Sequence, residues 1–280
     1  MLLLLFCRER FLAAATYLSS RAFPSTLLSS SPSLVQQPDS YPVLIPGVDA
    51  LNHGRAQPVS WVVTCPPTSS SPSSSTANAS HGMMSISLVA HSASKAGAEI
   101  FNNYGAKPNA ELLLGYGFTL PANPDDTIVL KIGGGGSGCS AAAQHEVGRG
   151  ARGAASVWDA IVDAVKQAQG GEEEVPKWQI ILESADTLRS MTESLLARLP
   201  GGFPVPETPG TLRGDVVEMI GHYVAGQREV LQGLLQYADD REMDGIASAR
   251  QDGVVIQLDG DDGDDDVDDE DEDVSGCNKD

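Results

Sequence analysis

The 280-residue sequence has few cysteines, no long apolar run and no concentration of basic residues. Its four cysteines are never at the short spacing of metal ligands, which fits a reducing compartment and therefore the cytoplasm, the nucleus or both. No apolar stretch approaches the roughly twenty residues that a membrane span needs, so we expect no membrane anchor. Because no basic stripe is present, we do not expect direct binding of nucleic acid either.

The sequence also lacks the short motifs of several common enzyme classes. Its five histidines are scattered, and no two have the i, i+4 spacing of a helical zinc site. It contains no Gly-x-Ser-x-Gly nucleophile elbow and no dinucleotide-binding Gly-x-Gly-x-x-Gly after a strand. The GGGGSG run at 133–138 has no Gly-Lys-Ser/Thr ending, so we interpret it as a flexible linker and not as a phosphate-binding loop.

Negative charge is abundant and concentrated at one end of the chain. The formal net charge is −20, and twelve acidic residues lie between Asp259 and Asp273, so removing them leaves −8 for the rest. That value is ordinary for a soluble domain. A self-repelling segment with almost no apolar residues cannot form a core, so we predict a disordered acidic tail over 252–280.

The apolar pattern divides the rest of the chain into two parts. Residues 1–132 combine an N-terminal helix over 2–18 with short irregular strands, interrupted by a Ser/Pro-rich insertion at 66–82. The positions of that helix expected to be buried are Leu4, Leu5, Phe11, Leu12, Ala15 and Leu18. The expected strands are VSWVVTC, MMSISLVAH, AEIFNNYG and TIVLKI, with a helical turn at Ala110–Leu114.

A Gly-rich linker over 133–152 is expected to lead into a helical part at 153–240. Apolar residues recur at three- and four-residue steps in the segments 155–165, 178–199 and 215–237, which predicts amphipathic helices that pack on one another. The predicted fold class is therefore α+β, with irregular short strands followed by a helical domain and the acidic tail.

Several polar residues stand in positions typical of loops and element ends: Ser20, Arg21, Asp49, Asn52, His53, Tyr104 and Tyr116. Each also has an ordinary structural interpretation. Asparagine favours turns, an arginine can be a surface charge, and a tyrosine ring can fill a core with its hydroxyl hydrogen-bonded. Composition and spacing alone leave these alternatives open.

Three stretches, SRAF, LIPGVDALNHG and AEIFNNYGAKPNAELLLGYGF, together resemble the C-terminal half of the SET domain in the Rubisco large-subunit lysine methyltransferase branch. The family pattern is Ser-Arg-x-Phe, then Pro-x-x-Asp-x-x-Asn-His, an acid-x-x-x-x-Tyr segment and Asn-x-Glu-Leu-Leu-x-x-Tyr-Gly-Phe. All four occur here in that order. In the helical part, SADTLRSMTESLLARL and YVAGQREVLQGLL resemble the substrate-binding domain of this branch, so the resemblance covers about residues 10–238.

The resemblance implies a protein-lysine N-methyltransferase that uses S-adenosyl-L-methionine. Asn52 and His53 would bind the cofactor, the asparagine through its side-chain amide, and Tyr104 would be the catalytic tyrosine beside the transferred methyl group. The residues implied on the side where the target enters are Ser20, Arg21, Asp49 and Tyr116. Gly105 and Gly117 are expected to let the backbone approach closely on both sides of this channel.

The implied partner is a protein that carries the target lysine, with a ribosomal or other basic protein as one candidate, and the chain is expected to be a monomer without a metal. The substrate, lysine versus histidine as the target, and the number of methyl groups stay open. The Gly-rich strand pair with which family members begin has no counterpart here, so we expect activity to need an upstream segment. The alternative is a catalytically incompetent SET fragment that acts as a protein-binding module.

Overall fold

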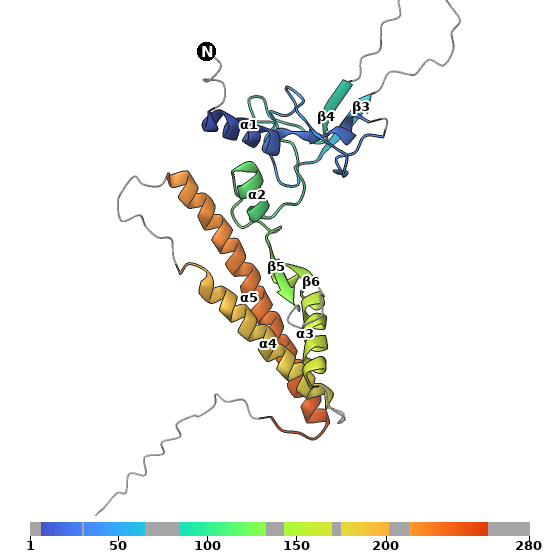
Figure 1. The fold of residues 1–280 in the computed structure, drawn as a ribbon, viewed down its shortest axis with the longest axis vertical. Coiled ribbons are helices and arrows are strands. Elements are labelled where there is room, and N and C mark those ends of the chain that lie inside the picture. The colour runs from blue at the N-terminus through green and yellow to red at the C-terminus, as the bar shows by residue number, and fades with distance from the viewer. Residues whose placement is uncertain are drawn as a thin grey trace, which may run out of the picture.

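The computed structural model describes residues 7–29, 31–64, 85–132, 143–169, 175–201 and 213–256. The structure is a mixture of helices and short strands (Figure 1), with the N-terminal elements at one end and three helices of the C-terminal part at the other. Helix α2 (Asn109–Tyr116) and the antiparallel hairpin of β5 (Thr127–Ile132) and β6 (Ala143–Gly148) lie between these two ends.

In the described residues of the N-terminal part, helix α1 (Arg8–Arg21) is accompanied by two small antiparallel sheets. β1 (Phe23–Pro24) pairs with β2 (Pro42–Val43), and the short 3₁₀ helix η1 (Ser25–Leu28) follows β1. β3 (Val59–Thr64) pairs with β4 (Ser85–Ala90). Pro24 faces Pro42 in the first sheet, and because proline has no N–H to donate, that ladder is limited to two residue pairs.

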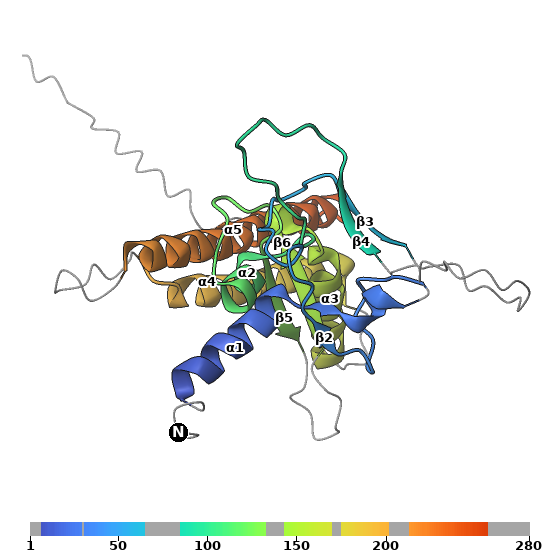
Figure 2. The ribbon, with the colours of Figure 1, turned by 90° about the horizontal axis from the view of Figure 1, so that it is seen from above.

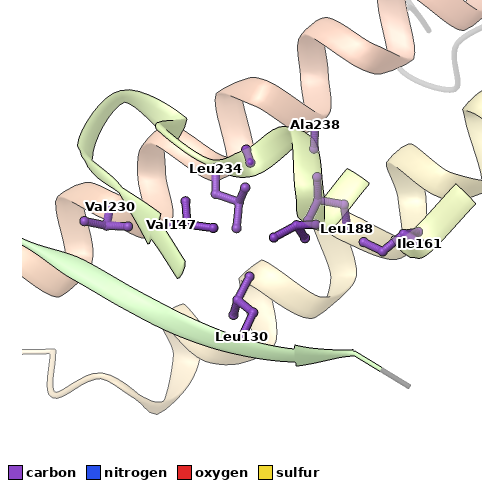
Figure 3. Close-up of a cluster of buried hydrophobic side chains, with 9 residues drawn as sticks. Leu130, Val147, Ile161, Leu188, Val230, Leu234 and Ala238 are labelled. Atoms are coloured by element: carbon purple, nitrogen blue, oxygen red, sulfur yellow. The ribbon is translucent and has the colours of Figure 1, made fainter. Parts of the chain in front are cut away.

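The C-terminal part is built from α3 (Ala154–Gln169), α4 (Lys177–Arg198) and α5 (Gly214–Gln251). Figure 1 shows α4 and α5 side by side along most of the length of α4, with α3 against their lower half. The β5–β6 hairpin packs on the same core (Figure 3), whose buried residues are Leu130, Val147, Ala154, Val157, Ile161, Leu188, Val230, Leu234 and Ala238. The helices predicted at 155–165, 178–199 and 215–237 are therefore confirmed.

The hairpin corrects the predicted boundary between the two parts. β6 and the 3₁₀ helix η2 (Arg149–Ala151) lie inside the linker predicted at 133–152, of which residues 133–142 fall outside the described chain. Because β6 buries only Val147 as an apolar side chain in the core, it has no alternating pattern that would reveal a strand. The strand TIVLKI, expected in the first part, pairs with β6 and contributes Leu130 to the helical core.

Two predictions for the N-terminal part are wrong. Helix α1 begins at Arg8 and has no buried residue, and Phe11, expected in a core, is 71% exposed because the N-terminal part of α1 projects away from the other elements (Figure 2). The AEIFNNYG segment forms a single β-bridge and no strand. Gly97 and Gly105 have φ values of 80° and 95°, so the backbone turns on both sides of this segment.

α5 extends to Gln251, beyond the end predicted for the helical part at residue 240, and Ile246 and Ala249 in this extension are buried. A β-carbon on Gly245 would lie 2.8 Å from Cδ2 of Leu182, so glycine permits this close helix–helix contact. The predicted insertion at 66–82 and the acidic run from 259 lie outside the described residues. In the described part of the chain, no helix combines the length and the apolar character needed to cross a membrane.

Candidate active site

Two segments far apart in the sequence cross at the centre of the N-terminal part. The backbone N–H of Asn102 donates to the carbonyl of Asn52, and the N–H of Gly54 donates to the carbonyl of Asn102, both at 2.8 Å. These bonds form a parallel bridge between His53 and Asn102. A β-carbon on Gly54 would lie 2.9 Å from that of Phe101, so a glycine after His53 allows the two backbones to cross.

The crossing places the side chain of His53 against Tyr104. The backbone N–H of Tyr104 donates a 3.0 Å hydrogen bond to Nδ1 of His53, and the two ring centroids are 5.2 Å apart. Since Nδ1 accepts this bond, the proton of the neutral imidazole is on Nε2. Burial lowers the pKa of His53, and the nearby charge of Lys107 lowers it further, so the ring is neutral at pH 7.

The hydroxyl of Tyr104 is hydrogen-bonded to one backbone carbonyl and one side chain. Its Oη donates a 2.7 Å hydrogen bond to the carbonyl of Leu51 and accepts one of 3.2 Å from Nη1 of Arg21. Burial raises the pKa of the Tyr104 phenol, although the charge of Arg21 acts in the opposite direction. The phenol therefore keeps its proton at neutral pH and acts as a hydrogen-bond donor.

Arg21, the last residue of α1, joins these separate segments. Its Nη1 also donates to the carbonyls of Asp49 at 3.3 Å and Leu51 at 3.2 Å, and its Nη2 donates to Oδ1 of Asn52 at 2.8 Å. Nδ2 of Asn52 in turn donates to Oε1 of Glu99 at 2.7 Å. The planar guanidinium and the carboxylate thus fix the orientation of the Asn52 amide from opposite sides.

Aromatic rings enclose Tyr104. Tyr116, the last residue of α2, has its ring centroid 5.0 Å from that of Tyr104, and Phe118 lies 6.0 Å from His53 and 6.3 Å from Tyr116. Gly117 ends α2 in the left-handed conformation with φ 76°, which turns the chain so that the residues on both sides of it reach the same cluster. The Tyr-Gly-Phe sequence therefore closes the site.

Two cavities meet at these residues. The smaller, of about 320 Å³, is lined by Ser20, Arg21, Asn52, His53, Tyr104, Tyr116 and Phe118. The larger, of about 730 Å³, lies beside the N-terminal elements and includes Asp49, Leu51 and the edge-to-face pair of Phe23 and Trp61. Both cavities are lined by Ser20, Arg21, Tyr104 and Tyr116. The phenol of Tyr104 thus stands in a wall shared by two compartments.

The structure brings the sequence-predicted residues together. Asn52 and His53 line the smaller cavity, Asp49 lines the larger, and the other four line both. The expectation for Gly105 and Gly117 is wrong, because nothing lies within 4 Å of a β-carbon built on either. Their φ values of 95° and 76° show that glycine is needed there for a left-handed backbone and not for close approach.

Sequence reasoning missed four contributors to the site: Leu51, Glu99, Lys107 and Phe118. Leu51 acts through its carbonyl, which every residue has, so its side chain gave no signal. Glu99 is the acid of the acid-x-x-x-x-Tyr segment, and that motif could have identified it. Lys107 lines the larger cavity beside its ion-pair partner Glu111. Among the described residues, no cluster of three or more His, Cys, Asp or Glu side chains could hold a metal ion.

The sequence is similar to part of two yeast proteins, although no family model matches the chain. It is 36% identical over 127 residues to the ribosomal lysine N-methyltransferase set10 of Schizosaccharomyces pombe. It is 34% identical over 113 residues to the ribosomal lysine N-methyltransferase 1 of Saccharomyces cerevisiae. These matches cover 45% and 40% of this chain but only 19% and 15% of the yeast proteins, so the chain spans less than a fifth of the curated relatives it matches.

Two solved structures share the fold. Rubisco LSMT bound to sinefungin and monomethyllysine matches with a TM-score of 0.55 and 17% identity, over 86% of this chain and 56% of that one. The SET domain of LSMT bound to lysine and AdoHcy matches with a TM-score of 0.55 and 18% identity, over 92% and 62%. The mixed fold is thus similar to that of these two LSMT structures, and the resemblance to this methyltransferase branch is confirmed.

Proposed function

We propose that this chain is part of an S-adenosylmethionine-dependent protein-lysine N-methyltransferase. The observation that carries the proposal is the wall shared by the two cavities, in which the Tyr104 hydroxyl is fixed between Leu51 and Arg21. A group-transfer enzyme of this kind has to bind a donor and an acceptor from different sides and let their reacting atoms meet. Tyr104 is placed where such a meeting point would be.

The smaller cavity offers groups that fit S-adenosylmethionine. Its volume is at the lower end of the range of about 300–1,000 Å³ that is usual for small-molecule sites. Arg21 suits a carboxylate, and the faces of the Tyr104 and Tyr116 rings suit the cationic sulfonium. In the parallel bridge the backbone groups of His53 point away from Asn102, and among the described residues they have no other partner, so they are available to a ligand. When bound, the cofactor would supply an activated methyl group.

The larger cavity suits the segment that carries the target amine. Asp49 contributes an acidic side chain, the charges of Glu111 and Lys107 pair with each other, and Leu18, Phe23 and Trp61 give the cavity an apolar wall. We propose a protein substrate for it, with a basic ribosomal protein as the first candidate because both yeast relatives are named as ribosomal lysine methyltransferases. We further propose that the protein acts as a monomer in the cytoplasm, the nucleus or both.

In methyl transfer, the residues of the shared wall would orient the amine and stabilise charge. A lysine amine with a reference pKa near 10.4 has to lose its proton before it can attack, and desolvation near a cation lowers that pKa. Tyr104 keeps its own proton at neutral pH, so it would orient the amine and not act as the base. The carbonyls of Asp49 and Leu51 are fixed dipoles that could stabilise the positive charge that moves to nitrogen.

Isothermal titration of the 280-residue chain with S-adenosylhomocysteine tests the proposal directly. Dissociation constants below the millimolar range, lost in an Asn52→Ala variant, would support it, with Gln236→Ala, which alters an exposed amide on α5, as the control. A well-folded chain that binds none of this compound would favour the alternative, a SET fragment that acts only as a protein-binding module. That alternative draws on the exposed apolar side chains of α1, among them Phe11 and Tyr17.

A further inference from the structure

The imidazole of His53 forms a hydrogen bond within the protein, although the residue also lines the smaller cavity. The residue is buried, with an exposed fraction of 9%, and its ring centroid lies 5.2 Å from that of Tyr104 and 6.0 Å from that of Phe118. Its Nδ1 is the acceptor for the backbone N–H of Tyr104 at 3.0 Å. The contact joins two residues that are 51 positions apart, immediately beside the phenol in the shared wall.

We propose that the His53 ring is a positioning residue, which holds the backbone of Tyr104 while it is neutral and releases it on protonation. The catalytic meaning of this contact rests on the proposed function, but the contact itself does not. A protonated imidazole carries a hydrogen on both nitrogens, so Nδ1 can no longer accept the Tyr104 N–H. Two N–H groups would then face each other in a buried place, which is unfavourable.

The charges around His53 keep the ring neutral. The positive charges of Lys107 and Arg55 disfavour the protonated form of His53, whereas the negative charge of Asp125 favours it. Arg55 and Asp125 form an ion pair with a 2.7 Å contact, so their effects on the ring partly cancel. Burial acts in the same direction as Lys107, and together they lower the pKa of His53.

The direction of the pH effect follows from this shift. In the unfolded chain a histidine gains its proton near pH 6.5, whereas folded His53 gains it only at a lower pH. Proton uptake therefore favours conformations in which the ring leaves its place. The hold on Tyr104 should be complete at neutral pH and should weaken as the pH falls below about 6.5.

Selective labelling makes the contact observable without any activity. The chain has six tyrosines and five histidines, so ¹⁵N-tyrosine and ¹³C-histidine labels give spectra with few signals. Tyr104→Phe identifies the Tyr104 amide, and His53→Asn identifies the His53 ring. We expect the Tyr104 amide signal to shift with pH at the same midpoint as the His53 ring, below 6.5.

Two substitutions separate positioning from packing. In His53→Asn, Oδ1 takes the place of Nδ1 as acceptor but cannot be protonated, so the Tyr104 amide should stay protected from solvent exchange and lose its titration. In His53→Leu, which keeps an apolar side chain but no acceptor, exchange of that amide should become at least tenfold faster at pH 7. His145→Asn, on β6 in the other part of the molecule, is the matched control and should leave the Tyr104 titration unchanged.

An unaltered titration of the Tyr104 amide in His53→Asn would overturn the proposal, as would unchanged exchange in His53→Leu. If circular dichroism shows that His53→Leu does not fold, the comparison with His53→Asn decides alone. S-adenosylhomocysteine binding is measured on the same samples. Absence of binding with an intact His53–Tyr104 titration would contradict the proposed function and leave the positioning contact standing.

Discussion

Gly226 of α5 faces the carboxylate of Asp126 so closely that any side chain on it would overlap Oδ2. Asp126 is fully buried between the two parts of the molecule. Its Oδ1 accepts the backbone N–H of Asn109 at 2.7 Å, at the first residue of α2, and Oδ2 accepts from the side chain of Asn109 at 3.2 Å. Because Tyr116 is at the other end of α2, this contact connects the helical part with the helix that carries a site residue.

The contact predicts a penalty for any β-carbon at position 226. Gly226→Ala should lower the free energy of unfolding by about 1–3 kcal/mol, because overpacking displaces the buried carboxylate or α5. Gly214→Ala on the same helix meets nothing within 4 Å and should leave stability unchanged or raise it by up to ~1 kcal/mol. Urea denaturation of both variants checks this pair, and equal stabilities would show that α5 and Asp126 are not in contact.

Asp126 also predicts a pH effect on stability. Burial raises the pKa of this carboxyl, although Asn109 and Arg149 favour its charged form. A folded pKa above the unfolded value near 3.9 means that the folded chain binds more protons, so this contribution to stability is largest in acid and is lost as the pH rises through the folded pKa. The stability of the wild type relative to Asp126→Asn should therefore be greater at pH 4 than at pH 7. A difference that is constant between these pH values would contradict the raised pKa.

Neighbouring leucines in α2 allow a matched test of the packing below the site. Leu112 is fully buried, whereas Leu114 is 90% exposed. Leu112→Ala should cost about 2–5 kcal/mol because it leaves a cavity under α2, and Leu114→Ala should change stability by less than ~0.5 kcal/mol. Thermal unfolding followed by circular dichroism measures both. Similar losses in the two variants would mean that α2 presents a different face to the core.

Glu99 should matter for ligand binding, although the sequence gave it no role. Without its carboxylate, the Asn52 amide is held only by Arg21, and loss of one such hydrogen bond costs about 1 kcal/mol. Glu99→Ala should weaken S-adenosylhomocysteine binding about fivefold in a calorimetric titration. Glu99→Gln keeps an acceptor and should bind almost as the wild type does. If it binds as weakly as Glu99→Ala, the charge of Glu99 matters and not the orientation of Asn52.

The seven residues that the sequence singled out lie together in the structure, whereas parts of the fold around them were not predicted. These seven residues belong to short motifs. Such motifs can be recognised from the types and the order of their residues, without knowledge of how the chain packs. The crossing of Asn52–Gly54 with Phe101–Tyr104 is a backbone contact between distant segments, and carbonyls such as that of Leu51 have no sequence signature. Neither the bridge nor the hydrogen bonds that fix Tyr104 could therefore be predicted from the sequence.

The fold was predictable where a segment buries one continuous stripe of side chains. Helices α3, α4 and α5 pack on one another through such stripes, and their periodicity identified them. The same periodicity led to a wrong prediction of buried residues in α1. An apolar stripe identifies one face of a helix but does not show whether another element covers that face. Periodicity gave no signal for β6, because Val147 is the one residue that this strand contributes to the core cluster.

Tyr104→Phe is the variant that isolates the proposed catalytic group. The change removes the hydroxyl that bonds Leu51 and Arg21 but keeps the ring between His53 and Tyr116 and the backbone N–H to His53. Methyl transfer from radiolabelled S-adenosylmethionine to a basic ribosomal protein fraction should fall by about two orders of magnitude or more, since one such polar contact is worth roughly 2.7–4 kcal/mol of barrier. Binding of S-adenosylhomocysteine should persist. Tyr17→Phe, on the exposed face of α1, is the control, and equal turnover in both variants would remove Tyr104 from the catalytic role.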